Sequence, residues 1–283
     1  NSTTTMTKPI ATFTKQIVLP VIQAIIIVLL TISTMAFAFP AYSQEKSLTD
    51  LQTRALVLNK QGKYSEAVKV AKEALKASEE EFGSDHPKTA ASMSILGLLY
   101  FSNGKYSDAE PLYLRALKIN TEALGEENLD VATDTDNLAL LYQAQGRYSD
   151  SIILYKQALQ IKEKELDPHH PSIAATMNNL AALYYSRGMY KEAEPYFEQA
   201  LSISEKNPGT DPDKMNTSLN ILALVYQAQG KYDEVEPLLK KALALSEKAH
   251  GQYNTAYATS LNNLAGLYKL QRKYSKSEQL YKR

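Results

Sequence analysis

Asparagine recurs in this chain at spacings of 42 residues or a multiple of it. Asn137, Asn179 and Asn263 belong to one column, whose other members are Ile95 and Ile221. The position just before each of them forms a second, mostly polar column: Ser94, Asp136, Asn178, Asn220 and Asn262. A side-chain amide carries a donor and an acceptor together, which suits the N–H and C=O of an extended peptide backbone. These residue types therefore indicate main-chain recognition.

An alternative remains open for both columns. The same amides could bond to adjacent helices and hold the structure together. In addition, Ile95 and Ile221 interrupt the first column, so they would offer apolar contact in place of a continuous series of backbone clamps.

Other chemistry finds little support in the chain. Its histidines are His86, His169, His170 and His250, and each lies in or beside a loop rich in helix-breaking residues. Adjacent histidines rarely chelate one ion, and no third ligand accompanies His169 and His170. No Gly-rich phosphate loop, nucleophile elbow or carboxylate pair stands out. We therefore expect neither catalysis nor a metal or other cofactor.

The elements that would position the asparagines repeat with the same period. Glycines stand 42 residues apart, and a tyrosine follows each of them two places later: Gly62, Gly104, Gly146, Gly188 and Gly230. Arg272 and Tyr274 close the series. A period without drift indicates one supersecondary unit stacked many times, with each copy packing mainly on its neighbours.

One copy reads as a helical hairpin. Met177, Leu180, Ala181 and Tyr184 follow helical spacing and predict a first helix that ends near Gly188, where glycine can take a left-handed conformation. A second apolar series of helical spacing follows Tyr190. We expect side-chain N-caps at the start of the second helices, at Ser65, Ser107, Ser149, Asp233 and Ser275.

At this level of detail the chain resembles the tetratricopeptide repeat. The resemblance rests on the run Tyr-x-x-x-Gly-x-Tyr-x-x-Ala with Ala-Leu further on, and it spans roughly residues 48–283. The 42-residue period, Asn-Asn-Leu-Ala at 178–181 and 262–265, and Ala-Glu-Pro at 109–111 and 193–195 are similar to the longer subtype of kinesin light chains and related bacterial proteins. The resemblance implies an all-α, right-handed α-solenoid whose first helices line a concave groove.

The resemblance also assigns a place to the asparagines. In such repeats the first column faces the groove, and its asparagines hold peptide main chain. Carried over by position, this role falls to Asn137, Asn179 and Asn263. Positions where related proteins grip a terminal carboxylate hold no basic residue here, which argues against a carboxylate clamp: Leu98, Leu140, Ala182, Leu224 and Gly266.

Composition limits the partners. The chain has 31 basic and 31 acidic residues, so no global field attracts nucleic acid or an anionic membrane. It contains no cysteine, which excludes disulfides and thiolate metal sites. We therefore expect protein or peptide partners and no nucleic acid.

The N-terminal segment, residues 1–43, has the pattern of a secretory signal. Residues 16–38 carry no charge, Lys8 and Lys15 precede them, and small-x-small cleavage candidates follow at 36–38 and 41–43. We expect cleavage and export to the periplasm or medium. The alternative is an uncleaved anchor in the inner membrane, because 23 uncharged residues can span a bilayer.

Residues 44–283 are then expected to form about six repeats, with the last one truncated at Arg283. Taken together, these features predict a non-catalytic scaffold that captures partner segments in a concave groove. One alternative is a regulatory or targeting arm of a larger enzyme, for example a caspase-like peptidase, whose catalytic domain would lie beyond the C-terminus. The other is a membrane-tethered assembly factor.

Overall fold

The computed structural model describes residues 40–283, apart from 208 and 210. Residues 1–39 of the expected signal segment, with the cleavage candidate at 36–38, lie outside these residues, whereas the candidate at 41–43 falls in the first described helix. The described residues form twelve α-helices and no strand. Within this part of the chain, no helix is both long and apolar enough to cross a membrane.

The chain divides into two compact units, Asn1–Ala77 and Ser78–Arg283. The described part of the first unit is α3 (Pro40–Lys60) and most of α4 (Tyr64–Phe82), joined by a tight turn at Gly62. Small and apolar residues are buried on both helices, including Ala55, Leu58, Ala67 and Ala71. The described part of this unit is therefore a helical hairpin formed by α3 and α4.

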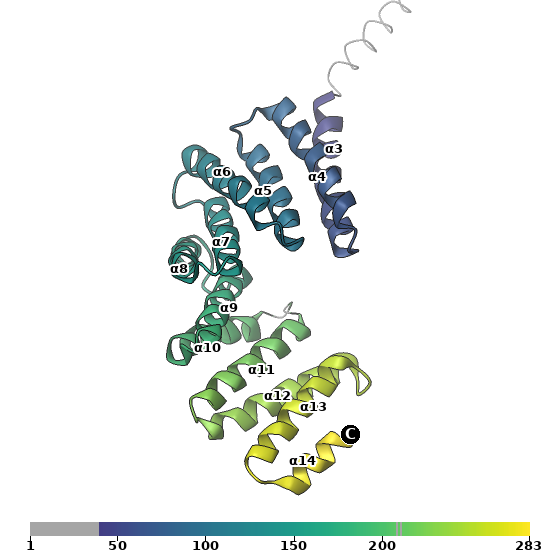
Figure 1. Ribbon diagram of the computed structural model, residues 1–283, viewed down its shortest axis with the longest axis vertical. Helices are drawn as coiled ribbons and strands as arrows, with labels where there is room; N and C mark the ends of the chain where they lie inside the picture. The colour runs from purple at the N-terminus through teal and green to yellow at the C-terminus, as the bar shows by residue number, and fades with distance from the viewer. Residues whose placement is uncertain (1–39, 208, 210) are drawn as a thin grey trace, which may run out of the picture. The chain divides into compact units, whose positions relative to one another are not determined.

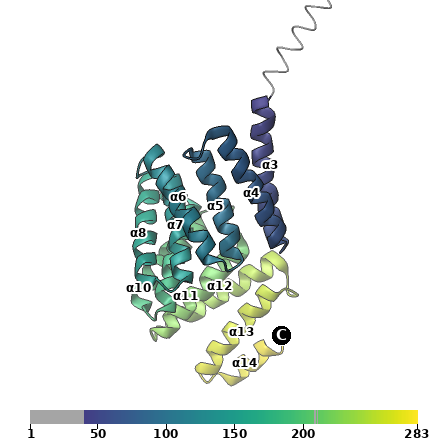
Figure 2. The same cartoon turned by 45° about the horizontal axis from the view of Figure 1, so that its top comes forward.

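The second unit contains five hairpins in chain order, drawn in Figures 1 and 2. Each pairs a first helix with a second helix: α5 (Pro87–Ser102) with α6 (Tyr106–Leu124), α7 (Leu129–Ala144) with α8 (Tyr148–Glu165), α9 (Pro171–Ser186) with α10 (Tyr190–Lys206), α11 (Pro212–Ala228) with α12 (Tyr232–His250), and α13 (Thr255–Leu270) with α14 (Tyr274–Tyr281). The second helices α6, α8, α10 and α12 also pack on the first helix of the next hairpin. This arrangement is the expected α-solenoid.

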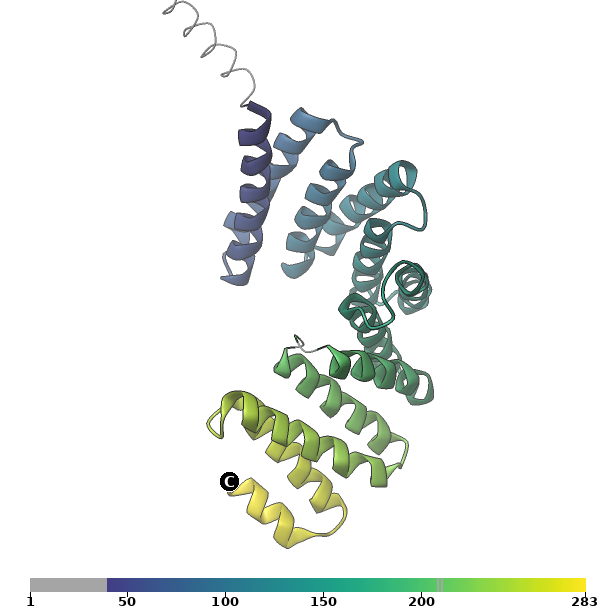
Figure 3. The ribbon, with the colours of Figure 1, turned by 180° about the vertical axis from the view of Figure 1, so that it is seen from behind.

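First helices also contact one another, at α5 with α7, α7 with α9, and α11 with α13. Second helices of successive hairpins show no comparable packing in the described residues. The first helices of residues 78–283 therefore lie on the inner side of the stack. Figure 3 shows this for α5 and α7, which lie inside α6 and α8.

The turn within each hairpin explains the glycine column. Gly188 has a φ of 72°, and the N–H of Met189 returns to the carbonyl of Tyr184 at 2.9 Å. This geometry is a Schellman-type helix end, which needs a left-handed residue at that place. Arg272 takes the same conformation with a φ of 59°, and it is the only residue other than glycine to do so among those described.

The predicted N-caps of the second helices are wrong. In the second unit these helices begin at the tyrosine itself, and the preceding residue makes no side-chain cap bond: Lys105, Arg147, Met189, Lys231 and Lys273. The Schellman turn is the physical reason, since it reverses the chain and starts the new helix within two residues of the glycine. Ser107, Ser149 and Ser275 therefore lie inside the first turn, as does Asp233. Ser65 has the same place in α4, which begins at Tyr64.

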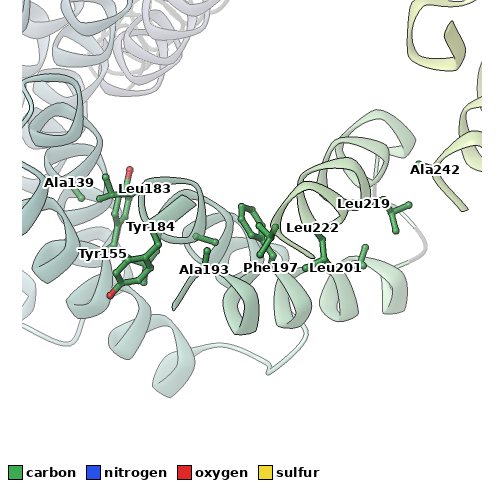
Figure 4. Packing of buried hydrophobic residues seen from close by; sticks show 13 residues of the cluster. Ala139, Tyr155, Leu183, Tyr184, Ala193, Phe197, Leu201, Leu219, Leu222 and Ala242 are labelled. Carbon is green, nitrogen blue, oxygen red and sulfur yellow. The ribbon is translucent and has the colours of Figure 1, made fainter. Parts of the chain in front are cut away.

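The core consists of repeated columns from both helices of each hairpin. In the central hairpins Leu180, Leu183 and Ala181 of α9 meet Phe197 and Ala193 of α10, all of them fully or almost fully buried. Figure 4 shows how this cluster continues into Leu219 and Leu222 of α11. Burial of one such side chain is worth about 1.5–3 kcal/mol. Because the clusters run from hairpin to hairpin, the inner faces of the first helices are held in register.

Candidate functional site

The inner side of the first helices carries one uncovered stripe per helix. Positions i, i+4, i+7 and i+11 are partly or fully exposed on all five helices of the second unit. We call these residues the inner stripe: Ala91, Ile95, Leu98, Ser102, Thr133, Asn137, Leu140, Ala144, Ala175, Asn179, Ala182, Ser186, Thr217, Ile221, Leu224, Ala228, Thr259, Asn263, Gly266 and Leu270. None of them is charged.

The second helices carry charged side chains, in contrast to this stripe. Ion pairs lie on these helices and at the turns, for example Lys118 with Glu122 and Lys241 with Glu205. The inner stripe therefore presents aliphatic groups, hydroxyls and amides only. Such a surface can bind an uncharged segment without having to desolvate a charge of its own.

Two residues of the asparagine column keep their amides open. Asn179 is exposed, Asn137 is half-buried, and neither side-chain amide makes a hydrogen bond within the described residues. Asn262 is exposed in the same way on α13. These three amides retain both donor and acceptor capacity toward solvent or a ligand.

Asn263 and Asn220 have a different environment. The Asn263 amide donates to the Oδ1 of Asn220 at 2.8 Å, across the α11–α13 boundary. The Asn220 amide donates in turn to the carbonyl of Asn216 at 2.9 Å, and the buried Asn216 reaches the hydroxyl of Ser260 at 3.1 Å. The amides of this group therefore link neighbouring helices, which is the alternative that the sequence left open.

The second column supplies such links at other boundaries. Ser94 of α5 donates to the carboxylate of Asp134 on α7 at 2.6 Å, and the amide of Asn120 donates to the same carboxylate at 2.7 Å. Burial raises the pKa of Asp134 above its ordinary value, while the bonds from Ser94 and Asn120 act in the opposite direction.

At the next boundary the link is ionic. Asp136 of α7 pairs with the ammonium of Lys162, which is only 5% exposed, and accepts from the hydroxyl of Thr176 at 2.7 Å. Lys162 also donates to Thr176 at 2.9 Å. Burial raises the pKa of Asp136, and the charge of Lys162 opposes that shift.

The boundary between α9 and α11 lacks such a link. The amide oxygen of Asn178 is buried there and has no hydrogen-bond partner in the part of the chain that the structure describes. The hydroxyl of Ser218 donates to the carbonyl of Lys214 in its own helix at 3.1 Å. A cavity of about 690 Å³ opens at this boundary, and Asn178, Asn179 and Ile221 are among the residues that line it.

A second cavity, of about 590 Å³, lies against α11, α13 and the start of α14. Asn220, Asn262 and Asn263 line it together with Leu224 and Gly266. Hence each candidate asparagine of α9, α11 and α13 borders one of the two cavities. Of the remaining candidates, Asn137 and Ile95 lie on the inner stripe of α7 and α5.

The histidines have structural roles in the loops. His86 and His170 are the N-caps of α5 and α9, where their Nδ1 atoms accept from backbone N–H groups at 3.1 Å. His250 contacts Asp213 at 2.7 Å. Within the described residues, no cluster of three His, Cys, Asp or Glu side chains is arranged to hold a metal ion.

Sequence reasoning missed the alanines and core residues that line the larger cavity, such as Ala175 and Phe197. The loop sequence Asn207-Pro208-Gly209 was a signal for this cavity. Proline disfavours helical backbone in the preceding residue, so this sequence predicts an early end of the helix that comes before the loop.

Comparison with known proteins agrees with this architecture. The family model of the tetratricopeptide repeat matches residues 47–122, 96–164, 130–206 and 214–283. No protein of curated function matches the chain.

Solved structures give the same result. The nearly identical TPR-like repeats of a kinesin light chain-type protein from Podosopora anserina are 28% identical, with a TM-score of 0.62, and the match covers 70% of this chain and 93% of that one. BtubC (BKLC) from P. vanneervenii is 26% identical, with a TM-score of 0.68, over 79% of this chain and 88% of that one.

A Rap protein complexed with competence and sporulation factor is also similar, with a TM-score of 0.59. Its identity is 17%, over 86% of this chain and 76% of that one, so the likeness concerns the fold alone. The four family matches cover most of the chain, and the hairpins, turns and stacking agree with them. The chain belongs to the tetratricopeptide repeat family.

Proposed function

We propose that the protein is a non-catalytic scaffold that captures an extended segment of a partner polypeptide along the inner stripe. The observation that carries this proposal is an uncharged stripe on five successive first helices, with the open amides of Asn137 and Asn179 within it. An extended segment offers one N–H and one C=O per residue, and both have complements in a side-chain amide.

Partner choice in this scheme depends on the pattern along the stripe. Ile95, Ile221 and Leu224 contribute apolar contact at the positions where the amides are interrupted. An uncharged segment with spaced apolar side chains fits this surface better than an acidic or basic one, because a charged group would lose hydration without gaining a partner.

A selection from random peptides tests the proposal. Phage-displayed 12-residue peptides would be enriched on the full chain, and the affinity of one enriched peptide would be measured by calorimetry. We expect the double variant Asn137→Ala/Asn179→Ala to weaken this peptide about tenfold, since each net hydrogen bond is worth about 1 kcal/mol.

The matched control is Lys118→Ala/Glu122→Ala, which removes an exposed ion pair of α6 and leaves the inner stripe unchanged. Its affinity should equal that of the unmodified chain. Equal binding by the asparagine variant, or loss of binding by the control, would contradict capture along the stripe.

A further inference from the structure

We propose that the cavity between α9 and α11 is a selectivity pocket, which takes one aliphatic or aromatic side chain of the captured segment while a backbone N–H of that segment donates to Asn178. This inference rests on the proposed function and adds to it the class of residue that the partner must carry.

The first argument is that the α9–α11 boundary differs from the other boundaries between successive first helices. Polar side chains bridge α5 to α7 through Ser94 and Asp134, α7 to α9 through Asp136 and Thr176, and α11 to α13 through Asn263 and Asn220. These three pairs of helices also pack directly on each other, whereas α9 and α11 make less direct contact than any of them. The boundary at α9 and α11 is therefore the least closed of the four in the second unit.

The second argument is the unpaired acceptor. The amide oxygen of Asn178 is buried and has no hydrogen-bond partner among the described residues. An unpaired buried acceptor costs about 1–3 kcal/mol, so a ligand that supplies a donor recovers that loss. Ser218, one period after the residue that bridges to Asp136, bonds within its own helix and leaves this acceptor unpaired.

The local sequence explains why the cavity exists. α10 ends at Lys206, earlier in the repeat than α6 and α12 end in theirs. Asn207 precedes a proline and has extended backbone, with φ of −100° and ψ of 107°. Its amide donates to the carbonyls of Ile203 and His169, at 2.8 and 2.5 Å. The helix end is thus fixed, and the space beside α11 stays open.

The lining decides the chemistry of the occupant. Ala174, Phe197 and Ile203 are buried residues that form an apolar part of the wall, and Ala175 and Ile221 continue it to the inner stripe. Asp211, the N-cap of α11, also lines the cavity, as do Asp213 and Lys214 in the first turn of that helix. A volume of about 690 Å³ lies within the range of 300–1,000 Å³ typical of ligand pockets.

The position of the cavity identifies the occupant as part of an extended segment. Five of its lining residues belong to the inner stripe, namely Ala175, Asn179, Ala182, Thr217 and Ile221. A segment bound along the stripe would therefore pass the mouth of the cavity. One of its apolar side chains can enter while the backbone stays beside Asn178 and Asn179.

A peptide series with one variable residue tests this assignment. The probes are fluorescein-labelled nonapeptides of the sequence Ser-Asn-Gln-Ser-X-Ser-Gln-Asn-Ser, with X as Phe, Leu, Ala, Asp or Lys, titrated against the full chain by fluorescence polarisation. We expect the Phe and Leu peptides to bind about tenfold more tightly than the Ala peptide, through burial of the apolar side chain. The Asp and Lys peptides should bind no better than the Ala peptide.

Two alanines of the same column give a matched pair of variants. Ala175→Leu fills the mouth of the cavity, and Ala91→Leu adds the same side chain at the equivalent exposed position of α5. We expect Ala175→Leu to abolish the preference for Phe and Leu, and Ala91→Leu to keep it. Should Ala175→Leu fail to fold by circular dichroism, Ile221→Asp provides a second test, since it should transfer the preference from Phe to Lys.

The outcomes separate this inference from the proposed function. If the phage-selected peptide binds along the stripe but X has no influence, the pocket is overturned and the scaffold function stands. The pocket is also overturned if Ala175→Leu keeps the preference. If neither the nonapeptides nor any selected peptide binds, both proposals fail.

Discussion

Asn263 on α13 donates its side-chain amide to the amide oxygen of Asn220 on α11, at a distance of 2.8 Å. Asn179 has the same place in its repeat as Asn263, yet it is exposed and makes no hydrogen bond within the described residues. One column of identical residues therefore contains an amide that links two helices, in Asn263, and an amide without a hydrogen bond, in Asn179. The difference leads to opposite expectations for stability and for binding.

Replacement of Asn263 by alanine should lower the free energy of unfolding by about 1–2 kcal/mol, because it removes a bond between helices and leaves the Asn220 oxygen unpaired. Asn137→Ala should change it by less than about 0.5 kcal/mol. Urea denaturation followed by circular dichroism measures both. Equal effects of the two variants would show that the environments of these amides do not differ as described.

The buried Lys162 should be essential for stability as long as Asp136 is present. Lys162→Met leaves a buried carboxylate without its cation, and we expect a loss of about 3 kcal/mol. The double variant Asp136→Met/Lys162→Met removes both charges and should recover most of that loss. The control is Lys118→Met, which breaks an exposed ion pair and should cost less than about 0.5 kcal/mol. A double variant no more stable than Lys162→Met would contradict this account.

Asp134 should make stability depend on pH in a defined direction. Burial raises the pKa of its carboxyl above the ordinary 3.8, so the folded state holds a proton that the unfolded state has lost. The stability from this group is therefore fully present below about pH 3.8 and is lost as pH rises through the raised folded pKa.

Asp134→Asn removes this ionisation and keeps an oxygen that can accept from Asn120. We expect the variant to be more stable than the unmodified chain at neutral pH, with the difference shrinking toward acidic pH. Melting temperatures measured from pH 3 to 8 test the sign. A difference that grows on acidification would refute it.

Arg272 should be a site of backbone strain. Its φ of 59° is left-handed, a conformation that costs about 1 kcal/mol for a residue with a Cβ and little for glycine. Arg272→Gly is therefore expected to stabilise the chain by about 1 kcal/mol. Gly230→Arg places the same residue in the equivalent turn, where nothing lies within 4 Å of an added Cβ, and should destabilise the chain by a similar amount. Thermal melting of both variants decides whether the backbone is the cause.

We also propose that the N-terminal segment directs export. Expression of the full chain in a Gram-negative host should give a periplasmic product that begins at Phe39 or Gln44, after the cleavage candidates. Intact-mass measurement of the fractionated protein identifies the new N-terminus. A membrane-bound product that retains residues 16–38 would favour the anchor instead.

The sequence by itself determined the hairpins, the stacking order and the family. These features depend on local periodicity and on turn residues such as Gly188. Because every copy repeats the same pattern, a helix that is poorly defined in one copy can be placed from the others. The sequence misplaced the second-helix caps, because the choice between Tyr190 and a later start depends on the return bond from Met189 to Tyr184.

Only the tertiary structure decided which polar residues bond to a neighbouring helix and which keep an unpaired group. Asn220 and Asn178 are the same residue type in the same column, yet one has its hydrogen bonds and the other has a buried oxygen without a partner. The reason is physical: these contacts join helices about 40 residues apart, and their distance depends on where α10 ends and how closely α9 approaches α11. A period in the sequence specifies equivalent positions, whereas the spacing of packed helices specifies what each of those positions touches.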